Sequence, residues 1–98
     1  SMRVTVYGGL RAATGAKTVE VDTDVETIAE ALGRFVEAYP RARSQLFDAE
    51  GEIRPSVRVM RDGERVELDT ACPPEAELQL FPAMQGGSEN ETRDVQRP

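Results

Sequence analysis

The side chains that most often carry enzymatic chemistry are scarce in this sequence of 98 residues. It has no histidine and one cysteine, Cys72, so a Cys–His nucleophile pair and a His-rich metal site are both excluded. Cys72 stands in the segment TACPPEA, beside two prolines and no basic residue that would activate the thiol. We expect Cys72 to be a small, partly buried filler of the interior rather than a reactive group.

A second candidate for chemistry is the main chain at Gly86-Gly87. The apolar segment Leu80-Phe81 leads through Pro82 into this pair, and the mostly polar residues 88–98 follow it. Glycine pairs are common in turns and linkers, so the pair alone is weak evidence for a function. Whether it is a linker or a functional end therefore depends on the elements that precede it.

The bulk properties limit the partners. The formal net charge is −6, and Lys17 is the single lysine. The acidic balance makes nucleic acid an unsuitable partner, because phosphates require basic patches. No apolar run approaches the roughly 18 residues of a membrane-spanning helix, and the sequence shows no signal peptide. We expect a cytoplasmic protein that does not bind membranes.

The periodicity of the apolar residues predicts the elements. Residues 2–7 and 17–22 alternate as two strands of a hairpin, whose long loop has room for one helical turn. A helix follows, with a capping box at residues 23–26, an apolar face and a stop at Pro40. The face consists of Ile28, Ala31, Leu32, Phe35, Val36 and Tyr39.

Three further strands follow the helix. Residues 55–68 predict a hairpin that turns at Asp62-Gly63, a type I′ signal, and residues 77–81 predict a last strand. Leu46 and Phe47 are expected to anchor the connection before the hairpin. The order is β-β-α-β-β-β, which predicts an α+β fold with one main helix packed on one face of a mixed sheet.

This order, together with three motifs, resembles the MoaD/ThiS family of ubiquitin-like proteins. The family includes the sulfur carriers of molybdopterin and thiamine synthesis and the small archaeal modifiers. The motifs are VTVYGGLRAATG, SVRVMRDGERV and LFPAMQGG. Two residues depart from the family pattern: Arg58 replaces a common asparagine, and Ala83 replaces a second proline.

The resemblance implies a β-grasp domain over residues 2–82 and a flexible tail over 83–87. Residues 88–98 show no hydrophobic pattern beyond Val95, so we expect them to form a disordered extension. The resemblance also implies that the terminal glycine carboxylate is the working group. An ATP-dependent activating enzyme adenylates this carboxylate, and sulfur or an amine then displaces AMP. Such proteins are carriers rather than enzymes, and the resemblance implies no cofactor and no metal.

The parity of the strands predicts where such a carrier would dock. Since the valines and leucines of the first and last strands face the helix, Tyr7 and Phe81 face outward. The resemblance makes these strands parallel neighbours, so the two rings are expected to lie together at the root of the tail, next to Pro82. Either Met60 or Arg61 joins them from the third strand, and alternation does not decide which. Exposed aromatic residues in this position are plausible interface anchors.

The extension is the main departure from the family, because an amide bond to Ser88 blocks the carboxylate of Gly87. Three possibilities stay open: a protease removes residues 88–98, the extension disables the carrier, or the extension is not native. We favour processing between Gly87 and Ser88, since disorder expected after Gly87 makes cleavage sterically easy and Ser88 is a small residue to follow the cut bond.

The products also stay open. As a sulfur carrier the chain would end in a thiocarboxylate at Gly87 and serve the large subunit of molybdopterin synthase or another sulfur-accepting enzyme. As a modifier it would form isopeptides with lysines of target proteins, or with Lys17 of another copy. The alternative is an unprocessed β-grasp interaction module with an inert diglycine linker.

Overall fold

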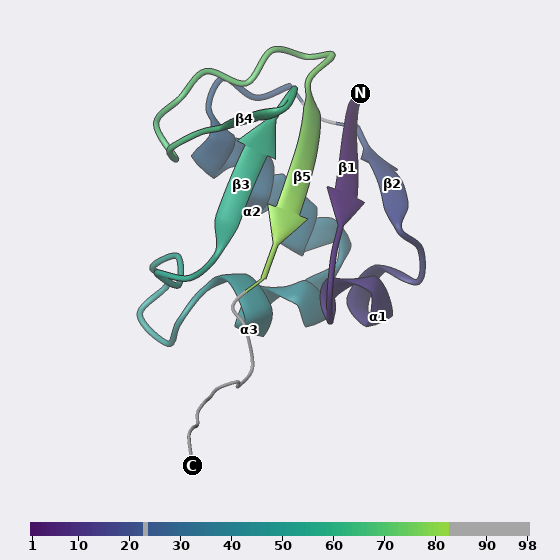
Figure 1. Ribbon diagram of the computed structural model, residues 1–98, viewed down its shortest axis with the longest axis vertical. Coiled ribbons are helices and arrows are strands. Elements are labelled where there is room, and N and C mark those ends of the chain that lie inside the picture. Colours follow the sequence, from purple (N-terminus) through teal and green to yellow (C-terminus); the bar gives the residue numbers. More distant parts are fainter. Residues whose placement is uncertain (23, 83–98) are drawn as a thin grey trace.

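The strands of the protein form one mixed sheet of five strands (Figure 1). The computed structural model describes residues 1–22 and 24–82. The strands are β1 (Met2–Val6), β2 (Thr18–Val21), β3 (Arg58–Arg61), β4 (Glu64–Arg65) and β5 (Glu77–Phe81), and their order in the sheet is β2-β1-β5-β3-β4. The pairing of β1 with β5 is parallel, whereas β1 with β2, β3 with β5 and β3 with β4 are antiparallel. The predicted fold class is confirmed, including the parallel contact between the first and last strands.

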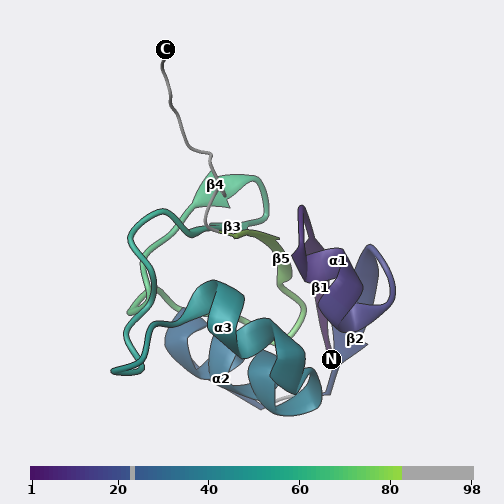
Figure 2. The ribbon, with the colours of Figure 1, turned by 90° about the horizontal axis from the view of Figure 1, so that it is seen from below.

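The helices gather on one side of this sheet. They are α1 (Leu10–Thr14), α2 (Ile28–Ala38), the 3₁₀ turn η1 (Pro40–Ala42) and α3 (Arg43–Leu46). Figure 2 shows α2 and α3 together below the sheet, while α1 lies beside the end of β1. The main helix α2 is the predicted one, and α1 is the helical turn expected in the loop of the first hairpin.

The core lies between α2 and the inner face of the sheet. Alternate residues of β1 and β5 point into it, and the apolar stripe of α2 covers them. Burial of each large side chain contributes roughly 1.5–3 kcal/mol to the free energy of unfolding. The side chains with at most 1% exposure include Met2, Val4, Val6, Leu10, Ile28, Leu32, Phe35, Leu46, Leu78 and Leu80. Leu46 is therefore an anchor as predicted, and Phe47 packs against the core from its edge.

The start of α2 differs from the sequence prediction. The helix begins at Ile28 with Thr27 as its N-cap, so the capping box predicted at residues 23–26 is wrong by four positions. The Thr27 hydroxyl accepts a hydrogen bond from the Glu30 amide at 3.2 Å, and the Glu30 carboxylate accepts one from the Glu26 amide at 2.9 Å. The sequence holds two successive T-x-x-E matches, and the second one caps the helix.

Contacts distant in sequence decide between the two matches. The amide of Ile28 donates to the carbonyl of Thr70 and the amide of Ala29 donates to the carbonyl of Leu68, both at 2.9 Å. These bonds satisfy two of the amides that a helix leaves unpaired in its first turn. Val25, which lies before the helix, is 8% exposed and packs into the core.

The second hairpin turns where the sequence predicts. Asp62 and Gly63 have φ angles of 53° and 89°, the left-handed pair that a type I′ turn requires. The amide of Asp62 donates to the carbonyl of Glu77 at 2.9 Å, which ties the turn to the start of β5. The strand β4 is shorter than the alternating pattern suggests, at two residues.

The cap of α2 can be tested by truncation. Replacing Thr27 with alanine leaves the Glu30 amide without its partner, and we expect a loss of about 1 kcal/mol in the free energy of unfolding. The measurement is urea denaturation followed by circular dichroism. Ser44→Ala, an exposed hydroxyl outside α2, is the control and should change stability by less than about 0.5 kcal/mol. Equal effects of both substitutions would show that Thr27 does not cap the helix.

Candidate docking face and the root of the tail

Two aromatic rings stack where β1 and β5 end. The parallel register pairs Val6 with Leu80, so the next residue of each strand, Tyr7 and Phe81, reaches the outer face at the same level. The ring centroids are 4.3 Å apart and the planes differ by 9°. Such a contact stabilises by roughly 0.5–1.5 kcal/mol beyond the burial of area. The predicted proximity of the two rings is confirmed, and both side chains are half-buried.

A cation lies against each end of this stack. The Lys17 Nζ atom is 5.7 Å from the centroid of the Tyr7 ring, and the Arg58 Cζ atom is 5.1 Å from that of Phe81. Lys17 directly precedes β2, and Arg58 pairs with Phe81 across β3 and β5. We call the four residues Lys17, Tyr7, Phe81 and Arg58 the aromatic row. It presents an apolar centre between two positive charges, and each exposed cation–π contact adds roughly 0.5–1 kcal/mol.

Pro82, the last residue that the structure describes, packs against the turn after β1. A Cβ atom on Gly8 would come within 3.2 Å of the Pro82 Cγ atom, so the ring of Pro82 lies close against the turn that follows β1. Gly8 has a φ of 60°, a conformation that glycine adopts without strain. Pro82 is therefore held against the body, next in sequence to Phe81 of the aromatic row.

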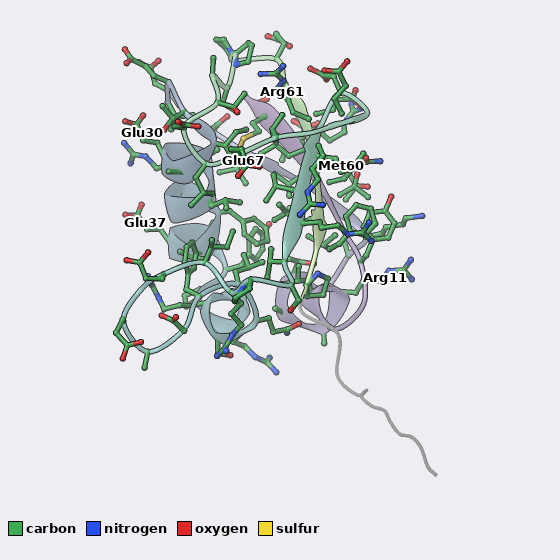
Figure 3. All side chains as sticks on the ribbon, turned by 60° about the vertical axis from the view of Figure 1, so that its left-hand side comes forward. Arg11, Glu30, Glu37, Met60, Arg61 and Glu67 are labelled. Carbon is green, nitrogen blue, oxygen red and sulfur yellow. The ribbon has the colours of Figure 1, made fainter. Side chains whose placement is uncertain are left out.

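The third strand contributes a different residue from those considered in the sequence. Met60 pairs with Gln79 and lies on the outer face, whereas Arg61 pairs with Leu78 and shares its inward parity. The Arg61 guanidinium donates to the carbonyl of Ala71 at 2.6 Å (Figure 3), so it holds the loop before β5 and does not join the aromatic row.

Arg58 is the residue that the sequence reasoning missed. Its parity was available in the alternation of Val57 and Val59, which are 7% and 4% exposed and point inward. An outward Arg58 and an outward Met60 follow directly from that alternation. Arg58 places a cation on the face of Phe81.

Cys72 has no reactive character. It is 2% exposed, and its sulfur atom lies 4.0 Å from that of Met2. Burial raises the pKa of the Cys72 thiol, an effect that the positive charge of Arg61 partly offsets. The interpretation as a filler is confirmed, with the side chain more fully buried than expected. Within residues 1–22 and 24–82 no cluster of acidic or sulfur side chains could hold a metal ion, and no helix there could span a membrane.

The diglycine itself lies beyond the part of the chain that the structure describes. This holds for Gly86, Gly87 and Ser88, and for the whole of the predicted tail and extension. The described residues end at Pro82, directly after the aromatic row.

Comparison with known proteins identifies the family. The chain matches the ThiS family over residues 4–87. It is 36% identical over 83 residues to small archaeal modifier protein 1 of Haloferax volcanii, covering 84% of this chain and 95% of that protein. The crystal structure of small archaeal modifier protein 1 from the same organism superposes with a TM-score of 0.80, over 88% of this chain and 98% of that one. CysO in the BexX/CysO complex of Amycolatopsis orientalis shares the fold, with a TM-score of 0.73 at 23% identity over 89% of this chain and all of that one.

The chain belongs to the ThiS family, and its fold is the ubiquitin-like β-grasp. Its general role is that of a small carrier or modifier protein, not that of an enzyme. The family match ends at Gly87, so residues 88–98 lie outside it.

The close approach of Pro82 to Gly8 yields a paired test. In Gly8→Ala the methyl group would press on Pro82, and the backbone would hold alanine in a left-handed conformation. We therefore expect a loss of roughly 1–2 kcal/mol in the free energy of unfolding. Gly33→Ala is the matched control, because no atom lies within 4 Å of the added carbon and the site is inside α2. It should stabilise by roughly 0.5–1 kcal/mol. Thermal or urea denaturation measures both, and a stabilised Gly8→Ala variant would contradict the described packing.

Proposed function

We propose that the working group of this chain is the carboxylate of Gly87, exposed by removal of residues 88–98. An ATP-dependent activating enzyme adenylates it, and the acyl-adenylate is then converted to a thiocarboxylate or an isopeptide. The observation that supports this most is the stacked pair of Tyr7 and Phe81 at the root of a tail whose family match ends at Gly87.

The reach of the tail supports the same proposal. From Pro82 to Gly87 the chain can span roughly 20 Å when extended. A body held through the aromatic row could therefore place the carboxylate deep inside a partner enzyme. The glycines would pass a narrow channel because they carry no side chains.

The chemistry explains why processing is needed. Adenylation requires an anionic carboxylate oxygen to attack the α-phosphorus of ATP, and pyrophosphate leaves. While Gly87 is bonded to Ser88 its carbonyl is an amide and has no such oxygen. The proposed division is thus a β-grasp body over residues 2–82, a tail over 83–87 and a removable cap over 88–98, cut by a protease between Gly87 and Ser88.

The proposed partners follow from the two products. Sulfur transfer would supply a sulfur-accepting enzyme such as a molybdopterin synthase large subunit, and conjugation would join Gly87 to lysines of target proteins. A protein of the same fold, CysO of A. orientalis, is seen as a complex with BexX. Since the activation consumes ATP, we place the proposed reaction in the cytoplasm.

The competing proposal is an interaction module that keeps residues 88–98. The aromatic row would serve it equally well, because docking alone needs no free carboxylate. The two proposals differ in whether the terminus changes chemically.

The chemistry is tested with three forms of the chain, ending at Gly86, Gly87 and Pro98. Each is incubated with the activating enzyme of the source organism, ATP and a sulfur donor, and its intact mass is measured. We expect only the form ending at Gly87 to exchange oxygen for sulfur, because only it presents the family's terminal carboxylate. The form ending at Gly86 controls for a nonspecific reaction of any C-terminal glycine.

Intact mass of the protein purified from its own host tests processing separately. If every molecule retains residues 88–98, the processing step is wrong. If the form ending at Gly87 is neither thiocarboxylated nor found in conjugates, the interaction module is the better description.

The docking face is tested by removing its rings. The double substitution Tyr7→Ala and Phe81→Ala should lower kcat/KM for adenylation by roughly 10- to 100-fold, since aromatic anchors at interfaces contribute about 1–3 kcal/mol in total. The assay is ATP–pyrophosphate exchange on the form ending at Gly87. Arg34→Ala, an exposed residue of α2, is the control and should leave the rate unchanged. A folded double variant that is activated at the full rate would rule out docking through the row.

A further inference from the structure

The single lysine of the chain stands at one end of the aromatic row. Lys17 is exposed, and its Nζ atom lies 5.7 Å from the centroid of the Tyr7 ring. Its backbone is fixed, because the carbonyl of Lys17 accepts a hydrogen bond from the Val6 amide at 2.8 Å. The amine is therefore accessible for acylation, and its distance from the row is limited by the length of its own side chain.

We propose that an isopeptide formed on Lys17 closes the docking face of the copy that accepts it, so that conjugation of this chain to itself stops after one addition at that site. The inference rests on the proposed function, since it requires activation to proceed through the aromatic row. It adds a limit on the product that the family does not supply.

The bond-forming step is an aminolysis. The unprotonated Nζ of Lys17 in one copy attacks the carbonyl carbon of the Gly87 acyl-adenylate of a second copy. The new C–N bond forms, the bond between that carbon and the AMP oxygen breaks, and AMP leaves with the electron pair. One proton passes from the nitrogen to solvent, and ATP has supplied the leaving group.

The product obstructs the row for two reasons. An anchor residue must approach its partner to within about 4–4.5 Å, yet the attached glycines begin at an atom beside the Tyr7 ring. The second β-grasp body is held on a link of roughly 20 Å, so it stays near the same face. Acylation also removes the positive charge at this end of the row and with it the cation–π contact.

An attachment at position 17 differs from an attachment elsewhere on the surface, because position 17 adjoins the aromatic row. Glu37 provides the comparison: its side chain is 69% exposed on α2, and Figure 3 shows it on the helical side of the molecule, away from Met60 of the outer face. A body attached at position 37 would leave the row open. The position of the attachment, rather than attachment as such, is what should stop activation.

The experiment uses Lys17→Cys and Glu37→Cys in the form ending at Gly87. Each thiol is coupled to a maleimide polyethylene glycol of about the mass of the domain, and mass spectrometry checks that the buried Cys72 is unlabelled. ATP–pyrophosphate exchange with the activating enzyme is measured before and after coupling. Comparing rates within each variant removes the effect of the substitution itself.

Coupling at position 17 should lower kcat/KM by roughly tenfold or more, as expected when an interface anchor is covered, and coupling at position 37 by less than about twofold. Equal losses at the two positions, or no loss at position 17, would overturn the inference while leaving the proposed activation intact. If the unmodified form ending at Gly87 is not activated at all, the proposed function fails and this inference fails with it.

Discussion

The parallel pairing of β1 with β5 is the contact on which the rest of the structure depends. It joins the two ends of the domain in the middle of the sheet, with Val4 beside Leu78 and Val6 beside Leu80. The inner residues of these two strands form the floor of the core beneath α2. Because parallel neighbours keep the same parity at the same level, Tyr7 meets Phe81 on the opposite face. One register thus sets both the stability of the body and the surface at the root of the tail.

The local charge of the aromatic row differs from that of the chain. The formal net charge is −6, but the row carries Lys17 and Arg58 against its rings. Such a contrast favours an approaching partner whose apolar pocket has an acidic rim. Arg3 of β1 and Glu77 of β5 form an exposed ion pair at 3.3 Å, which is a weak contact and contributes little to stability.

The type I′ turn and the outward faces of Tyr7 and Phe81 could be predicted from alternation and turn residues, because these depend on neighbouring residues. The parallel contact of the first and last strands joins distant segments and was predicted from the resemblance. The start of α2 could not be predicted. Two T-x-x-E matches four residues apart are locally equivalent, and carbonyls of Leu68 and Thr70, some forty residues away, decide between them. The inward side of Arg61 was available from the alternation of Val57 and Val59, but its hydrogen bond to the carbonyl of Ala71 was not, since a separate loop contributes that carbonyl. The fate of the bond between Gly87 and Ser88 is in a different category, because an external protease and not the fold would determine it.

The contact between Gly8 and Pro82 has a consequence for how this chain can change over evolution. The space that Pro82 occupies exists because residue 8 lacks a side chain. A substitution at position 8 would therefore press on the ring of Pro82 without changing any residue near it in the sequence. Positions 8 and 82 are expected to vary together among relatives, although more than seventy residues of sequence separate them.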